Sequence, residues 1–161
     1  MLFKAPKADD DPELLGSFAY FTLDLCFSLL PGERFGGVIY GLQSSSRESC
    51  EWPHYSQPSV MVDSKGDLYC SVVAAQPVVA RALEPNRWYL VALTYDHGAQ
   101  LQEVYFNGVK VQEKAGLWRY QWHFMTFAQV GTGFSASDFL DGPGWYGYQG
   151  IVDVGRDTFR R

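Results

Sequence analysis

The chain has 161 residues, 47% of them hydrophobic and 16% aromatic, and its formal net charge at pH 7 is −5. This length suits one domain with a hydrophobic core of its own. The acidic balance argues against nucleic acid as a partner, because proteins that bind phosphate backbones need basic patches to displace counterions. No apolar run approaches the roughly 20 residues of a transmembrane helix, so no membrane partner is expected either.

The first fifteen residues differ in composition from the rest of the chain. They contain three consecutive aspartates at 9–11 and lack the apolar segment of a secretory signal. We expect 1–15 to form an N-terminal tail or an edge segment, and 16–161 to form a single domain. The aspartates are expected to be solvated, although such a carboxylate cluster could also hold a cation.

Three cysteines, Cys26, Cys50 and Cys70, leave at least one thiol without a partner in the chain. The sequence also has no N-x-S/T acceptor for glycosylation. Both features favour a reducing compartment, and therefore the cytoplasm if the chain is full-length. The thiols are expected to act as small buried hydrophobic groups.

Alternating apolar and polar residues predict the first long strand at 17–30, because side chains along a strand point to opposite faces in turn. The residues that share the apolar face are Ala19, Phe21, Leu23, Leu25, Phe27 and Leu29. A second strand is expected at 38–43, followed by a polar loop at 44–58. The segments 59–63 and 68–74 predict a hairpin around a turn in which Gly66 adopts a positive φ.

A short strand is expected at 77–83, and a longer one at 88–95 in which Trp88 is interpreted as a large core anchor. Its partner strand is predicted at 102–106. The pair Asn107-Gly108 then indicates a type I′ turn, since this dipeptide tolerates the positive φ that both central positions need.

The run W-x-x-V-A-x-T-Y-D, followed after a short turn by V-Y-F-N-G, resembles the central signature of laminin G-like domains. These domains belong to the concanavalin A-like jelly-roll superfamily. The matching residues are Trp88, Val91, Ala92, Thr94, Tyr95, Asp96, Val104, Tyr105, Phe106, Asn107 and Gly108. The resemblance implies an all-β fold, a jelly-roll β-sandwich of two antiparallel sheets.

The flanking segments FAYFTLDLCFSL, GGVIYGLQ, QVGTGF and GYQGIVDVGR resemble the remaining strands of the family, in the same order. The resemblance covers nearly the whole chain. It departs from the family in the last strand, where Val152 and Gly155 interrupt the usual Asp-Val-Arg run after Gly-x-Ile.

The superfamily contains enzymes, but the residues that their chemistry needs are missing from this sequence. Glucanases with this fold carry paired acids in a Glu-x-Asp-x-x-Glu pattern, which does not occur here, and lyases combine Gln-x-His with a Tyr-x-Lys strand, of which the Tyr-x-Lys is absent. The histidines His54, His97 and His123 form no ligand motif. We therefore predict no catalytic residue and no enzyme activity, with a glycan-active hydrolase or lyase as the less favoured alternative.

Calcium is the cation that the family resemblance raises, because related domains often hold it with loop carboxylates. Asp96, Asp138 and Asp141 are loop acids of this kind. Aspartate is also common in turns, where it bonds its own backbone. No metal ligand and no cofactor are predicted, and calcium remains an open alternative.

Aromatic residues give the remaining signal. Trp118, Tyr120, Trp122 and Phe124 alternate along 117–127, and a core between sheets is favoured over a sugar-stacking platform. Other rings are expected in loops, where they could form a contact surface or plug the ends of the sandwich. These candidate ligand-binding residues are Trp145, Tyr146, Tyr148, Trp52, His54 and Tyr55.

The sequence as a whole favours a non-catalytic recognition module that binds a glycan or a protein partner. The alternative is an intracellular interaction or scaffold domain that has no sugar ligand. The family resemblance is compatible with either partner, and the odd number of cysteines favours the intracellular alternative. The oligomeric state does not follow from the sequence.

Overall fold

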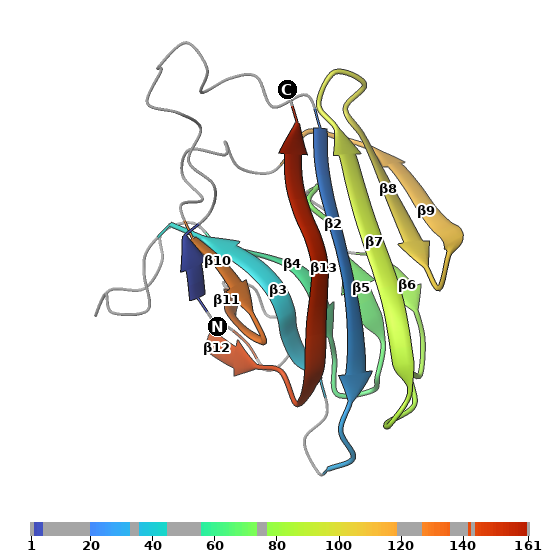
Figure 1. Cartoon of the computed structure of the whole chain (residues 1–161), viewed down its shortest axis with the longest axis vertical. Helices are drawn as coiled ribbons and strands as arrows, with labels where there is room; N and C mark the ends of the chain where they lie inside the picture. The colour runs from blue at the N-terminus through green and yellow to red at the C-terminus, as the bar shows by residue number, and fades with distance from the viewer. Residues whose placement is uncertain are drawn as a thin grey trace.

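The computed structural model describes residues 2–4, 20–32, 36–44, 56–73, 77–118, 127–135, 142 and 144–160. The regular elements in these ranges are β-strands. They form a six-stranded sheet, a five-stranded sheet and a separate two-stranded hairpin, and all of the strand pairs are antiparallel (Figure 1). The predicted all-β jelly-roll sandwich is therefore confirmed.

The six-stranded sheet has the order β1-β10-β3-β4-β5-β6. Its strands are β1 (Leu2–Lys4), β10 (Phe127–Val130), β3 (Gly37–Gln43), β4 (Ser56–Val62), β5 (Leu68–Cys70) and β6 (Val78–Ala80). Strand β1 lies at the edge, within the segment where a tail or an edge segment was expected.

The five-stranded sheet has the order β13-β2-β7-β8-β9. Its strands are β13 (Gly150–Arg160), β2 (Tyr20–Leu29), β7 (Trp88–Asp96), β8 (Leu101–Phe106) and β9 (Val109–Ala115). The hairpin consists of β11 (Thr132–Ser135) and β12 (Gly144–Gly147).

The core lies between the two large sheets and follows the alternation that the sequence predicts. Phe21, Leu23, Leu25 and Phe27 of β2 are at most 2% exposed and pack with Leu42, Val60 and Leu68 from the opposite sheet; all belong to one buried cluster. Trp118 packs against this cluster, with ring centroids 5.1 Å from Phe21 and 5.4 Å from Tyr95. The core interpretation is thus confirmed for Trp118, while Tyr120, Trp122 and Phe124 lie outside the described residues.

The hairpin between β8 and β9 has the predicted turn. Asn107 has φ 48° and Gly108 has φ 81°, as a type I′ turn requires. Asn107 also ties the turn to β7, because its backbone N–H donates to the Leu90 carbonyl (2.8 Å) and its Oδ1 accepts from the Leu90 N–H (3.0 Å). The asparagine therefore acts through its side chain as well as its backbone.

The interpretation of Trp88 as a core anchor is wrong. Its side chain is 54% exposed, whereas Tyr89 is 6% exposed and contacts Phe27 and Phe106 with ring centroids 5.7 and 5.6 Å apart. The reason is parity, since Tyr89 shares the inward face of β7 with Val91 and its alternate neighbours, and Trp88 points outward.

The polar loop expected at 44–58 ends earlier than predicted, because β4 already begins at Ser56. Pro58 lies inside this strand, opposite Gly41 of β3. The register of β4 with β5 begins only at Val60, so the missing N–H of Pro58 removes no bond from that ladder. A proline is tolerated here for a reason that the sequence alone does not reveal.

Candidate functional site

The β11–β12 hairpin lies on the outer face of the six-stranded sheet, away from the five-stranded sheet. Gly131 (φ 73°) turns the chain out of β10 while its N–H donates to the Ile39 carbonyl at 2.8 Å. Strand β11 then packs on β3 and β4. Val38 and Met61 are at most 1% exposed although they are not members of the core cluster, so the hairpin covers a second, smaller apolar layer.

Glycine allows the close approach of this hairpin to the sheet. A Cβ atom at Gly133 would lie 2.6 Å from Cγ1 of Val38, closer than real carbon contacts come. The hairpin is therefore seated directly on β3, and its side chains are held by the sheet below.

Trp145 is the exposed ring of this hairpin. It stands opposite Phe134 in the register, and the two rings meet edge to face with centroids 5.7 Å apart. Phe134 is 8% exposed and Trp145 is 42% exposed. The buried Phe134 ring therefore supports the Trp145 ring, part of which remains exposed to solvent.

The structure corrects the expected surroundings of the candidate aromatic residues. Trp145 and Tyr146 lie on strand β12 rather than in a loop. The neighbouring glycines, Gly142, Gly144 and Gly147, indicated a loop, but Gly144 and Gly147 are the two end residues of strand β12. Tyr146 is half-buried and its hydroxyl donates to the Gly142 carbonyl. The other predicted group, Trp52, His54 and Tyr55, lies outside the described residues.

Tyr148 lies in the core, so its expected exposure in a loop is wrong. It is 9% exposed, and its ring meets Phe27 edge to face with centroids 6.3 Å apart. Its backbone N–H donates to the Gly131 carbonyl at 2.9 Å, which turns the chain inward after the hairpin. The Tyr148 hydroxyl is buried and has no hydrogen-bond partner in the described part of the chain, and burial raises the pKa of Tyr148 above its ordinary value.

Replacing Tyr148 by phenylalanine is expected to leave the free energy of unfolding at pH 7 unchanged or raise it by about 1 kcal/mol. The variant removes a buried hydroxyl that has lost its water without gaining a partner. Because the pKa of Tyr148 is raised in the folded state, this tyrosine ionises at a lower pH in the unfolded chain. The free energy of unfolding of the wild type therefore falls as the pH rises above about 10. The phenylalanine variant should therefore lose less stability than the wild type in this range.

Urea unfolding at about pH 7 and about pH 11 measures both effects. Tyr20→Phe serves as a control, since Tyr20 is 50% exposed. A loss of more than about 1 kcal/mol at pH 7 in Tyr148→Phe would show that the hydroxyl has a partner.

A polar strip of three residues, Gln43, Ser56 and Gln129, lies beside the hairpin on the same outer face. Gln43 stands opposite Ser56, and Gln129 stands opposite Gly41. Their neighbours Leu42 and Ala128 belong to the core, so by alternation the strip points away from it. The three residues are at most 5% exposed, and Ser56 Oγ and Gln129 Oε1 have no hydrogen-bond partner among the residues that the structure describes.

Sequence reasoning missed this polar strip. Each residue is a single polar side chain near one end of its strand, and the three come from distant parts of the chain. Only the register β10-β3-β4 brings them together. Buried polar groups are normally paired, so the two oxygen atoms without a described partner are unusual for this face of the sheet.

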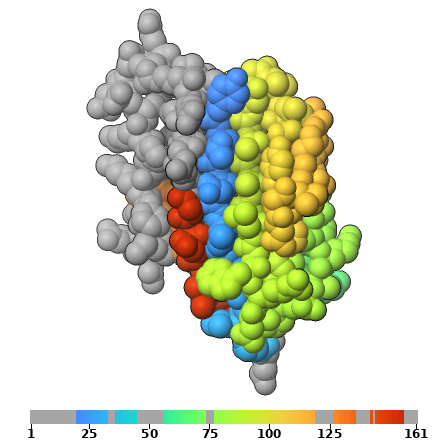
Figure 2. Space-filling view, turned by 45° about the vertical axis from the view of Figure 1, so that its right-hand side comes forward, coloured from blue at the N-terminus to red at the C-terminus, as the bar shows by residue number. Residues whose placement is uncertain are grey.

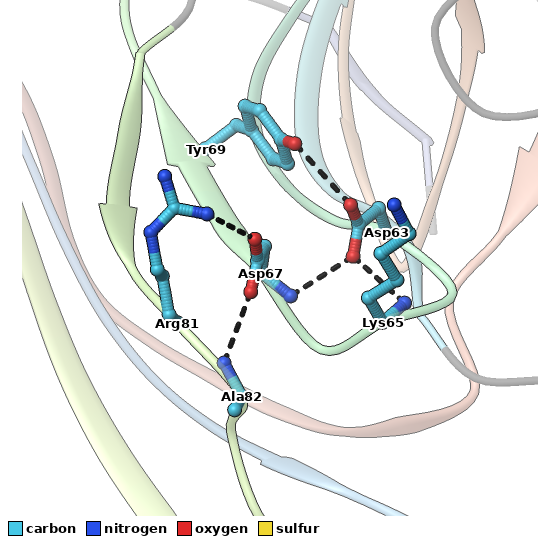
Figure 3. Close-up of polar contacts among 6 residues, drawn as sticks. All are labelled: Asp63, Lys65, Asp67, Tyr69, Arg81 and Ala82. Carbon is cyan, nitrogen blue, oxygen red and sulfur yellow. Dashed lines mark hydrogen bonds and ion pairs between the residues drawn. The ribbon is translucent and has the colours of Figure 1, made fainter.

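A second polar cluster, at the turn between β4 and β5, is explained by the turn itself (Figure 3). Asp63 Oδ1 accepts from the N–H groups of Lys65 (2.8 Å) and Asp67 (2.9 Å), and its Oδ2 accepts from the Tyr69 hydroxyl (3.2 Å). Asp67 pairs with Arg81 at 2.8 Å and accepts from a backbone N–H of the following strand connection. Burial, and secondarily the Asp63 carboxylate, raise the pKa of Tyr69. The Asp63 and Asp67 carboxylates thus stabilise the β4–β5 hairpin.

The calcium alternative gains no support from the residues described. Asp96 Oδ1 accepts from the Ala99 N–H at 2.9 Å, the usual role of aspartate in a turn. Asp138 and Asp141 lie outside the described residues. Within the described ranges no group of three or more histidine, cysteine or acidic side chains could hold a metal ion.

Two of the cysteines are described, and both are free thiols. Cys70 is buried and Cys26 is half-buried. Burial raises the pKa of the Cys70 thiol, which keeps it protonated and unreactive. Cys50 lies outside the described residues.

Similar solved structures include a carbohydrate-binding module. The CBM40 of the Ruminococcus gnavus IT-sialidase bound to alpha2,3 sialyllactose has a TM-score of 0.52 and 10% identity, covering 92% of this chain and 85% of that one. A second structure of the same CBM40 has a TM-score of 0.52 and 9% identity, covering 97% and 94%. At these identities the likeness shows the shared fold.

No curated protein matches the sequence of this chain. No helix that could span a membrane occurs in the part of the chain that the structure describes. The sequence model of the concanavalin A-like lectin/glucanases superfamily matches residues 36–143, which include the W-x-x-V-A run and both strands of its hairpin. With the two facing sheets described above, this match places the chain in the concanavalin A-like lectin/glucanases superfamily.

Proposed function

We propose that the chain is a non-catalytic module that binds a carbohydrate on the outer face of the six-stranded sheet, beside the β11–β12 hairpin. The observation that carries this proposal is Trp145, a 42% exposed ring braced by Phe134 on a strand that is seated on the sheet. An exposed indole offers an apolar face on which the C–H face of a sugar ring can stack.

The comparisons support the ligand class. The CBM40 module, which covers most of this chain, carries alpha2,3 sialyllactose in one structure and alpha2,6 sialyllactose in another. The superfamily to which the chain belongs includes lectins by its own description. Carbohydrate is therefore the favoured ligand of the Trp145 surface, and a protein partner at this surface is the alternative.

A binding role also agrees with the acidic residues that the structure places. Retaining and inverting glycosidases need two carboxyl groups that are free to reach one substrate. Asp63 and Asp67, two described acids of one hairpin, are occupied by the hydrogen bonds and the ion pair that stabilise this hairpin.

Replacing Trp145 by alanine is expected to weaken carbohydrate binding about tenfold to a hundredfold, because a central exposed ring carries a large share of the binding energy. The melting temperature should change little. A glycan array with and without EDTA identifies a ligand and its calcium dependence, and calorimetry with that glycan measures the loss.

Two matched variants sharpen this test. Trp88→Ala removes an equally large exposed ring from the opposite sheet and should leave carbohydrate binding unchanged. Gln129→Leu keeps the size of a buried side chain and removes its polar atoms, and it should also leave carbohydrate binding unchanged, because Gln129 is 1% exposed. An array without any bound glycan, or full affinity in Trp145→Ala, would contradict the proposal.

A further inference from the structure

The outer face of the five-stranded sheet carries three exposed apolar side chains that the core does not use. Trp88, Leu90 and Ile151 are 54%, 40% and 51% exposed. Figure 2 shows this face, with β13 in red, β2 in blue, β7 in yellow-green and β8–β9 in yellow to orange lying side by side at the surface. An exposed face of a sheet is usually polar, so a group of apolar side chains there calls for an explanation.

The strand register makes one patch of these three residues. Ser28 of β2 stands opposite Ile151 on one side and Trp88 on the other. Ser28 is 5% exposed, so the space between the two large side chains is closed. In the next row, Cys26 lies between Leu90 and Asp153. We call the surface formed by Trp88, Leu90 and Ile151 the apolar patch.

Two carboxylates adjoin the apolar patch. Asp153 stands in the row of Leu90, and Asp24 follows two residues away on β2. Asp24 is half-buried and Asp153 is exposed, and no hydrogen bond or ion pair to either occurs among the described residues. A partly buried carboxylate without a partner is a favourable site for a cation, because its hydration is already reduced.

The charges at the opposite edge of the same sheet are arranged differently. There, Lys110 Nζ lies 3.1 Å from Glu103 and 2.6 Å from Glu113, so the charges on β8 and β9 are matched within the chain. Among the described side chains, the carboxylates of Asp24 and Asp153 on β2 and β13 have no such cationic partner, and they lie next to the apolar patch.

We propose that the apolar patch docks a segment of a partner protein in which apolar side chains are flanked by lysine or arginine. The apolar side chains would cover Trp88, Leu90 and Ile151, and the cations would pair with Asp24 and Asp153. A second copy of this chain fits less well, since a self-complementary interface at this patch would bring the same carboxylates together. This surface is on the opposite side of the sandwich from Trp145, so both sites can be occupied at once.

A peptide-display library of random sequence, selected against the immobilised chain, tests this inference. The expected result is enrichment of peptides that combine aromatic or aliphatic residues with lysine or arginine. A synthetic peptide of the enriched sequence should lose at least about tenfold in affinity with Trp88→Ala, and also with Asp24→Asn/Asp153→Asn. Its affinity should fall as salt is raised, because the carboxylates lie at the surface.

Trp145→Ala is the matched control and should bind the peptide like the wild type, whereas it loses carbohydrate if the function proposed above holds. A second measurement uses the wild-type chain. Cys26 lies in the middle of the Leu90 row, so bound peptide should slow its alkylation, followed by mass spectrometry. Melting temperatures close to that of the wild type verify that the exposed substitutions leave the fold intact.

Three outcomes would overturn the inference. One is a library without enrichment, or with enriched peptides that lack basic residues. Another is sedimentation that shows a wild-type dimer abolished by Trp88→Ala, which would assign the patch to a second copy. The third is loss of carbohydrate binding in Trp88→Ala, which would make the patch a sugar site.

Discussion

Replacing Tyr89 by alanine is expected to reduce the free energy of unfolding by about 3–5 kcal/mol, the usual cost of removing a large ring from a core. Tyr89 is 6% exposed and packs between Phe27 and Phe106. Its hydroxyl also accepts from the Glu84 N–H at 2.8 Å, a bond that alanine cannot replace. Urea unfolding at neutral pH measures the loss.

The neighbouring Trp88→Ala is the control for this experiment. Its ring is 54% exposed, so the expected loss is within about 1 kcal/mol, even though tryptophan is the larger residue. If Trp88→Ala cost more than Tyr89→Ala, the parity assigned to β7 would be wrong.

Replacing Gly37 by alanine is expected to cost about 3 kcal/mol or more, since backbone strain and overpacking each contribute. Gly37 has φ 118°, which side chains rarely allow. The added Cβ would also lie 2.3 Å from the carbonyl oxygen of Gly147, a backbone atom that cannot rotate away. This contact joins β3 to the end of β12, the strand that carries Trp145. The variant is therefore also expected to make the position of Trp145 less well fixed.

Gly147→Ala provides the matched control for Gly37→Ala. A Cβ at Gly147 would meet nothing within 4 Å, so its effect is expected to be within about 0.5 kcal/mol. Thermal unfolding of the two variants side by side separates the clash from a general effect of glycine replacement. Equal losses would show that the hairpin is not seated on β3 as described.

Most of the fold could be predicted because its signals are local. Alternation along β2 and the Asn107-Gly108 turn each depend on neighbouring residues, and both are confirmed. The position of Trp88 could not be predicted in this way. Two adjacent rings begin β7, and which of them points inward depends on the pairing of β7 with β2 and β8.

The candidate site was harder to predict because it depends on tertiary contacts. Loop placement was expected for Trp145 and Tyr148, but one ring lies on a strand and the other lies in the core. The positions of both rings depend on the turn of the chain at Gly131 and on the close packing of Gly133 against Val38. Neither contact produces a recognisable pattern in the sequence. The polar strip depends on the register of three strands and was missed entirely.

The pairing of β2 with β13 has a consequence for how the chain reaches this structure. Tyr20 stands opposite Arg160, so one edge of the five-stranded sheet joins segments separated by almost the whole sequence. Contacts of such long range are slow to form, because a long loop must close before they yield any stabilisation. Strand β13 directly follows the hairpin that carries Trp145, so we expect the proposed ligand surface to form late in folding. A folding intermediate without the β2–β13 pairing would then be partly stable but unable to bind the proposed ligand.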